Sequence, residues 1–143
     1  MDIPPLDKVL DNINILVDEY FVIRVQEDKI FRMHEIAEEL ARESLYLSYH
    51  YLNQQREYAI ARSNYDIQSS ARKLALMDMP SYNNKKMTAT FAAMTAEQES
   101  IELKKSYLLA DAEREGINSI TFQIKENITG IRQRIASIKN TNV

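Results

Sequence analysis

Cysteine is absent from this chain of 143 residues, and glycine and proline are scarce, with 2 and 3 residues. The lack of cysteine excludes disulfide bonds and cysteine-based metal sites. A β-rich fold needs turn residues about every 8 to 12 positions, so this composition favours a few long helices instead. A chain of this length corresponds to about one domain and is long enough to bury a substantial core.

Membrane-directing segments are also missing. No N-terminal stretch combines basic residues with an apolar run and a cleavage site. No uninterrupted apolar span is long enough for a membrane helix. We therefore expect no membrane partner and a cytoplasmic location, which means the host cytoplasm if the chain is viral.

Patterns that carry catalysis are lacking as well. His34 and His50 have no companion ligands at metal-binding spacing. There is no Glu-x-x-His motif for a di-iron bundle, no glycine-rich phosphate loop, no nucleophile elbow and no HExxH motif. A cluster of acidic residues is interpreted as a solvated helix face: Glu35, Glu38, Glu39 and Glu43. The sequence predicts a protein that is not an enzyme and that holds no metal or cofactor.

Charge is unevenly distributed, although the net charge is only −3. Residues 1–53 carry 5 basic and 11 acidic side chains, and residues 91–116 carry 3 and 6. In contrast, residues 54–90 carry 6 basic and 3 acidic side chains, and residues 117–143 carry 4 and 1. This asymmetry suits an electrostatic binding face or head-to-tail self-association, and ordinary solvated helix faces are the alternative.

The first half of the chain predicts two helices. Pro4 and Pro5 precede apolar residues at helical spacing, which predicts an amphipathic helix over about 5–19. Residues 20–25 are aromatic and β-branched, which is typical of either a strand or an extended connector. Residues 26–79 contain neither glycine nor proline and predict one long helix in a hairpin or coiled coil.

A break in the helical pattern follows the long helix. Residues 79–84 include a proline and two asparagines, and we expect a loop that extends to about residue 94. Thr95 and Gln98 have the spacing of a capping box, which predicts that a helix begins at Thr95. The resulting division is an N-terminal helical region, 1–94, and a C-terminal oligomerisation helix, 95–143.

The last segment carries a seven-residue repeat of apolar residues, which is typical of helices packed side by side. Its isoleucines, here called the isoleucine stripe, are Ile117, Ile124, Ile128, Ile131, Ile135 and Ile138. The stripe is too extended for one hairpin partner, so we expect other subunits to bury part of it; an intramolecular three-helix fold is the alternative. Gly116 and Gly130 cost helix stability, and a close neighbouring helix would explain them.

Basic and aromatic residues alternate in the centre of the chain. Cations that follow the phosphates and aromatic rings that stack on bases are typical of single-stranded nucleic-acid binding. Heptad spacing indicates that Tyr51, Tyr58 and Tyr65 are packing residues, which leaves the basic side chains as contacts and Tyr82 as a stacking residue. The candidate nucleic-acid-binding residues are Arg56, Arg62, Arg72, Lys73, Tyr82, Lys85 and Lys86.

These residues resemble the UvsY-type recombination mediators of T-even-like phages. The run Tyr58-Ala59-Ile60-Ala61-Arg62-Ser63-Asn64-Tyr65 is similar to the basic Ala-Arg-Leu-Asp stretch of that family. Met77-Asp78, Tyr82, Lys86-Met87 and Thr88 follow with roughly the family's spacing. The C-terminal helix, which closes in Ile138-Lys139, resembles the family's oligomerisation segment.

The resemblance implies an all-α homo-oligomer, a ring of six or seven subunits or a bundle, that holds single-stranded DNA on a basic surface. It also implies that the protein loosens a single-strand-binding protein and helps to load a RecA-like recombinase. A protein-only interaction module, either an inhibitor of a host or defence complex or an assembly chaperone, is the alternative. A structural coiled coil is a further one.

Overall fold

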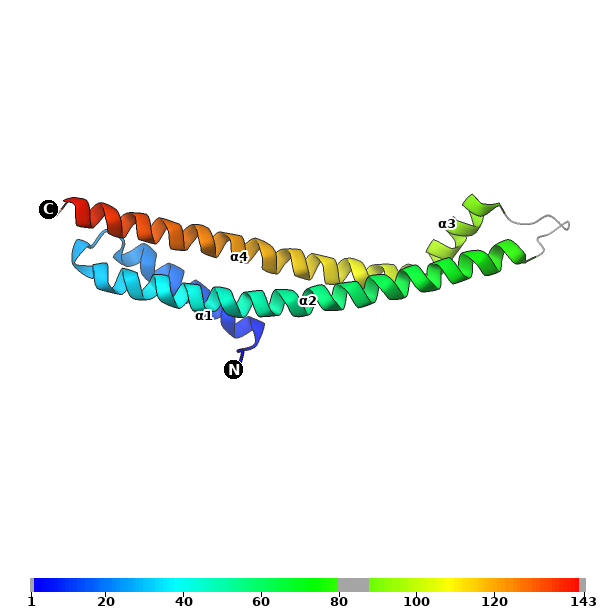
Figure 1. Cartoon of the computed structure of the whole chain (residues 1–143), viewed down its shortest axis with the longest axis horizontal. Helices are drawn as coiled ribbons and strands as arrows, with labels where there is room; N and C mark the ends of the chain where they lie inside the picture. Colours follow the sequence, from blue (N-terminus) through cyan, green and yellow to red (C-terminus); the bar gives the residue numbers. More distant parts are fainter. Residues whose placement is uncertain (1, 80–87, 142–143) are drawn as a thin grey trace. The chain divides into compact units, whose positions relative to one another are not determined.

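The computed structural model describes residues 2–79 and 88–141, and all regular structure within these ranges is helical (Figure 1). This confirms the expected all-α fold and its long helical hairpin, formed by α2 and α4. The elements are α1 (Leu6–Ile23), a 3-10 turn η1 (Glu27–Lys29), α2 (Ile30–Asp78), α3 (Ala89–Glu99) and α4 (Ile101–Thr141).

The chain divides into two compact units. The terminal unit comprises Met1–Leu52 and Gly116–Val143, and the middle unit comprises Asn53–Glu115. Each unit draws residues from both of the regions expected from the sequence, 1–94 and 95–143. In the terminal unit, α1 and the first part of α2 pack with the last part of α4. In the middle unit, the rest of α2 lies with α3 and the start of α4.

Helix α1 begins after Pro5, whose carbonyl oxygen accepts hydrogen bonds from the backbone amides of Lys8 and Val9. It extends to Ile23, beyond the expected end at residue 19. The expected strand or connector is therefore wrong for residues 20–23, which continue the helix, whereas residues 24 and 25 form the turn that follows it. Ile23 is buried and lies seven residues after Leu16, so core packing overrides the β-propensity of this run.

The isoleucine stripe is buried inside the terminal unit. Its six side chains are between 0 and 8% exposed in the isolated chain, and they pack with apolar residues of α1 and α2. The expectation that one chain cannot cover the stripe is therefore wrong. The reason is that the partner is not one helix but two, because α1 packs beside α2. The reason for assigning these six residues to oligomerisation is lost, and self-association itself stays a prediction.

The charge asymmetry is partly explained by the same packing. The acidic segment over 1–53 and the basic segment over 117–143 belong largely to one unit, so opposite net charges lie within one three-helix bundle. The Arg134 side chain also donates a hydrogen bond of 2.9 Å from Nε to the carbonyl oxygen of Arg24, which fixes α4 against the end of α1. Attraction within the unit therefore accounts for part of the pattern without a second subunit.

Helix α3 begins earlier than the capping-box pattern predicts. Thr88 is its N-cap, and the Thr88 side-chain oxygen accepts a hydrogen bond of 3.2 Å from the backbone amide of Phe91. The expected helix start at Thr95 is wrong, because Thr95 lies inside α3. The small core formed by Leu76, Ala92 and Ala96 holds α3 against α2, and this contact cannot be read from local spacing.

The two glycines of α4 are not sites of close helix approach. A Cβ atom built at Gly116 or at Gly130 would meet no atom within 4 Å. The expectation that a neighbouring helix explains them is therefore wrong for the described chain. Both residues are exposed, and each weakens α4 by roughly 1 kcal/mol relative to alanine.

Candidate nucleic-acid interface

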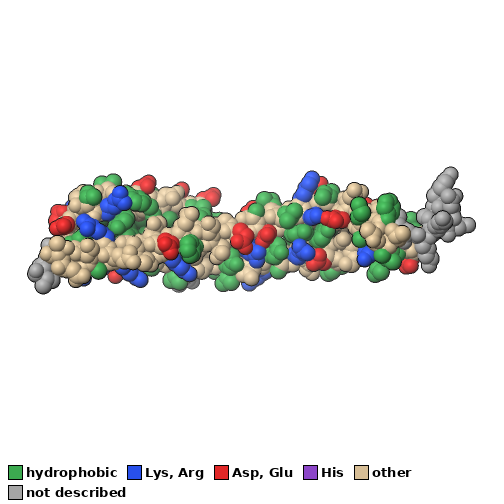
Figure 2. Space-filling view, turned by 90° about the horizontal axis from the view of Figure 1, so that it is seen from above, with side chains coloured by type: hydrophobic (Ala, Val, Ile, Leu, Met, Phe, Trp, Pro, Cys, Tyr) green, Lys and Arg blue, Asp and Glu red, His purple; other side chains and the backbone are tan. Residues whose placement is uncertain are grey.

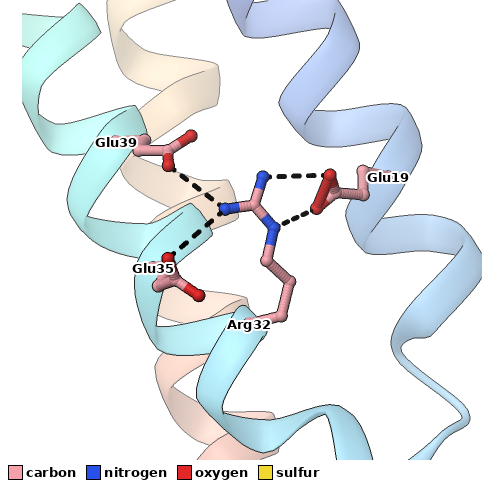
Figure 3. A network of polar contacts seen from close by, with 4 residues as sticks. All are labelled: Glu19, Arg32, Glu35 and Glu39. Atoms are coloured by element: carbon pink, nitrogen blue, oxygen red, sulfur yellow. Dashed lines mark hydrogen bonds and ion pairs between the residues drawn. The ribbon is translucent and has the colours of Figure 1, made fainter.

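Acidic residues of the terminal unit converge on Arg32 between α1 and α2 (Figure 3). The guanidinium pairs twice with Glu19 of α1, and its Nη2 donates to Glu19 Oε1 at 2.9 Å. Nη1 donates to Glu39 at 3.1 Å and lies 3.8 Å from Glu35. The hydrogen bond from Arg32 lowers the pKa of Glu19. Three carboxylates share this one guanidinium, so the cluster stays negatively charged and is a poor site for an anion.

The acidic face expected to be solvated is only partly so. Glu38 is exposed, but Glu43 is 4% exposed and belongs to the buried residues. Asn12 Nδ2 donates to Glu43 Oε1 at 3.4 Å, while Glu43 Oε2 has no hydrogen-bond partner among the described residues. The interpretation as a solvated face is therefore wrong for Glu43, because α1 covers this part of α2.

The tyrosines of the central segment pack inward, as expected. Tyr58 and Tyr65 lie with their ring centroids 6.4 and 5.1 Å from that of Tyr107, which is 7% exposed. Tyr51 packs against the core of the terminal unit. The three predicted packing residues are thus confirmed, because each tyrosine contributes its ring to a helix contact. Base stacking by Tyr58 or Tyr65 would require these contacts to open.

Arg62 is held at the surface of the tyrosine cluster. Its Cζ lies 4.6 Å from the centroid of the Tyr107 ring, and its Nε is 3.3 Å from Asp66. The Arg62 side chain nevertheless keeps 45% of its surface exposed. The cation–π contact fixes the guanidinium from one side and leaves the other side to solvent.

Arg72 is engaged by a residue that is distant in sequence. It pairs with Glu99 of α3, and a second hydrogen bond of 3.3 Å joins Nη2 to Oε1. The hydrogen bond from Arg72 lowers the pKa of Glu99. Arg72 therefore joins α2 to α3, and a phosphate would have to compete with Glu99 for it.

The remaining predicted contacts differ in how far the structure describes them. Arg56 is exposed and Lys73 is half-buried, and neither forms an ion pair within residues 2–79 and 88–141. Tyr82, Lys85 and Lys86 lie outside the described residues. The structure thus leaves Arg56 and Lys73 as available cations and Arg62 as a positioned one.

A second basic surface was not singled out from the sequence. Lys125, Arg132 and Lys139 are exposed on α4 in the terminal unit, and each follows the previous one by seven residues. None of the three forms an ion pair with another described residue. Their seven-residue spacing equals that of the isoleucine stripe, so the row of cations could be seen in the sequence. Only the packing of the isoleucine stripe on α2 shows that this row lies beside α2.

Other classes of site are not found in the described chain. Within residues 2–79 and 88–141, no three His, Asp or Glu side chains are grouped so as to hold a metal ion. No helix in the same residues has the length and apolar character needed to cross a membrane. Apolar side chains do reach the surface, as the face in Figure 2 shows.

Comparison with known proteins gives no further assignment. No protein-family model, curated protein or solved structure matches the chain.

Proposed function

We propose that this chain is a non-catalytic single-stranded DNA-binding protein that acts as a recombination mediator. The observation that supports the proposal is the presentation of Arg62, which is packed over Tyr107 and still 45% exposed. A guanidinium binds phosphate through two parallel hydrogen bonds, and a fixed guanidinium loses less entropy on binding. Arg62 is therefore the first phosphate contact.

The Arg62–Asp66 pair does not prevent this role. The pair joins residues four apart on one helix, with side chains 45 and 55% exposed. Exposed helix pairs of this type contribute little because water screens them, so a phosphate competes readily with Asp66. Arg56 and Lys73 of α2 supply further cations, whereas Arg72 contributes only after it leaves Glu99.

Binding by one chain is weak under this proposal. Neutralisation of about 3 phosphates gives a salt slope of only about −2 for a single strand. Assembly of six or seven subunits would multiply the contacts without new chemistry. In the proposed role, the assembled protein holds the strand, loosens a single-strand-binding protein and helps to load a RecA-like recombinase.

The test is binding to fluorescent oligo-dT at low and moderate salt. Arg62→Ala/Lys73→Ala is compared with Lys8→Ala/Lys29→Ala, which removes the same charge from two exposed lysines of the terminal unit. We expect the first variant to lose most of its affinity at low salt and the second to keep it. If the wild-type chain has no measurable affinity at low salt, the proposal is refuted.

A protein-only interaction module is the second candidate, favoured by the outer face of α2 in the middle unit. Ile60, Ile67 and Leu74 are seven apart and are 52, 64 and 63% exposed. A seven-residue apolar repeat is the pattern that packs against another helix. If the chain contacts a protein partner, whether another subunit or a different protein, this face is the contact surface.

Native mass spectrometry separates the assembled from the single form. Ile128→Asp is not a suitable variant, because Ile128 is 8% exposed and its replacement would disrupt the core. Ile60→Ser/Ile67→Ser changes only exposed side chains and is the better probe. A wild-type chain that is monomeric at micromolar concentration would refute the ring, and an oligomer that survives this double substitution would exclude the α2 face as its interface.

A further inference from the structure

The groove between α2 and α4 in the terminal unit contains two adjoining depressions. One, of about 280 Å³, is lined by residues of both helices, among them Ser44, Thr129 and Arg132. The other, of about 260 Å³, includes Tyr51 and Asn118. Lys125 lines both depressions, so they meet at this side chain.

The lining of the two depressions is positively charged. No Asp or Glu lines either depression, whereas a third depression beside α1 is lined by Glu39 and Glu43 together with Arg32 and Arg42. Lys125 and Arg132 line the groove, and Lys139 follows one heptad later on α4. At a rise of 1.5 Å per residue, successive cations are about 10.5 Å apart along the helix. The three charges therefore form a row rather than a single point.

The groove also contains neutral polar side chains, some of which are engaged with the backbone. Thr129 donates its hydroxyl hydrogen to the carbonyl oxygen of Lys125 at 3.0 Å, and Thr121 donates to that of Ile117 at 2.9 Å. Among the described residues, no hydrogen bond engages the hydroxyl of Tyr51 or the side-chain amide of Asn118. These two groups remain able to donate to an anionic oxygen, and the half-buried Tyr51 ring, which packs against the core of the terminal unit, borders the same depression as Lys125.

We infer that this groove is a phosphate-binding track for single-stranded nucleic acid, with Lys125, Arg132 and Lys139 as its cations. The inference rests on the proposed function and adds a site in the terminal unit to the contacts of the middle unit. Single-strand-binding surfaces combine a row of cations with a flat ring. A single strand is a more suitable occupant than an acidic peptide, because its phosphate backbone presents a regular row of charges to the row of cations.

The experiment compares Lys125→Ala/Arg132→Ala/Lys139→Ala with a control of equal charge, Lys8→Ala/Lys29→Ala/Lys105→Ala, which replaces three exposed lysines outside the groove. Thermal unfolding followed by circular dichroism first establishes that both variants are folded. Fluorescent oligo-dT is then titrated at several salt concentrations. We expect the groove variant to lose about tenfold in affinity and its salt slope to become shallower by about 2, since each phosphate contact contributes about 0.7 for single strands.

The outcomes are distinguishable from failure of the proposed function. If the groove variant binds as tightly as its control while Arg62→Ala/Lys73→Ala loses binding, the groove inference is wrong and the proposed function stands. If wild type does not bind oligo-dT at low salt, both are refuted. If poly-glutamate competes as effectively as oligo-dT and the groove variant abolishes both, the occupant is an acidic peptide, which overturns the inference. Retention of binding by Lys125→Arg/Lys139→Arg supports a role for charge.

Discussion

Replacing Ile131 by alanine tests whether the isoleucine stripe is the internal core of one chain. Ile131 is 0% exposed and packs in the cluster that joins α1, α2 and α4. The substitution removes three carbon atoms from a side chain that touches no solvent. If the stripe is internal, the cost appears in the stability of the single chain and does not depend on protein concentration.

The expected magnitude follows from the burial. Each buried methylene or methyl group contributes about 0.8 kcal/mol, so the lost transfer free energy is about 2.4 kcal/mol. Incomplete collapse of the cavity adds to this, and buried Ile-to-Ala changes cost about 2 to 5 kcal/mol. We expect a loss of about 3 kcal/mol. Ile15→Ala is the matched control: Ile15 is 64% exposed, so we expect a change within about 0.5 kcal/mol.

The assay is urea unfolding followed by circular dichroism, at two protein concentrations that differ by about twentyfold. An internal core gives the same difference in midpoint between Ile131→Ala and wild type at both concentrations. An intersubunit stripe gives a midpoint that rises with concentration, because association stabilises the folded state by mass action. Two results would refute the reasoning. One is a loss of stability below about 1 kcal/mol for Ile131→Ala. The other is a midpoint that rises with concentration in wild type and no longer rises in Ile131→Ala.

Three further predictions concern local features. Gly130→Ala should stabilise the chain by roughly 1 kcal/mol in urea unfolding, because the new methyl group meets no atom and helix propensity improves. Thr88→Ala should destabilise α3 by about 1 kcal/mol, measured by hydrogen exchange of the Phe91 amide, because the N-cap hydrogen bond is lost; unchanged protection would contradict the assignment. Arg32→Gln should cost about 1 kcal/mol at neutral pH, since the paired side chains are only about a third exposed. The Arg32 hydrogen bond lowers the pKa of Glu19 below 4.5, so this stability is present above pH 4.5 and is lost as pH falls through the folded-state pKa. Unfolding titrations of both proteins should therefore converge in acid, and a constant difference would exclude the Glu19 pairing.

Several errors of sequence interpretation share one cause. Residues 20–23 have the composition of a strand, but burial of Ile23 with Leu16 keeps them in α1. Thr95 has the spacing of an N-cap, yet α3 begins at Ala89, after the N-cap Thr88, because Ala92 and Ala96 pack on Leu76. In each case packing on another helix decided between locally similar alternatives: Ile23 belongs to a core shared with α2 and α4, and α3 packs on α2.

The candidate site was predictable to a different degree. The inward packing of Tyr58 and Tyr65 followed from their heptad spacing, because that spacing places them on one helix face. The partner of Arg72 could not be predicted from spacing, because Glu99 is 27 residues away on another helix. The groove cations were missed for a related reason: a row of exposed charges acquires meaning only when the neighbouring helix and the absence of acidic residues on its lining are known.

The amino-acid sequence by itself determined the helical character of this protein, the length of α2 and the existence of a buried face on α4. These properties depend on breaker residues and on periodicity, which are local along the chain. Only the tertiary structure decided what covers that face. A heptad repeat requires an apolar partner but carries no mark of whether the partner belongs to the same chain, and here α1 and α2 bury the isoleucine stripe within one molecule.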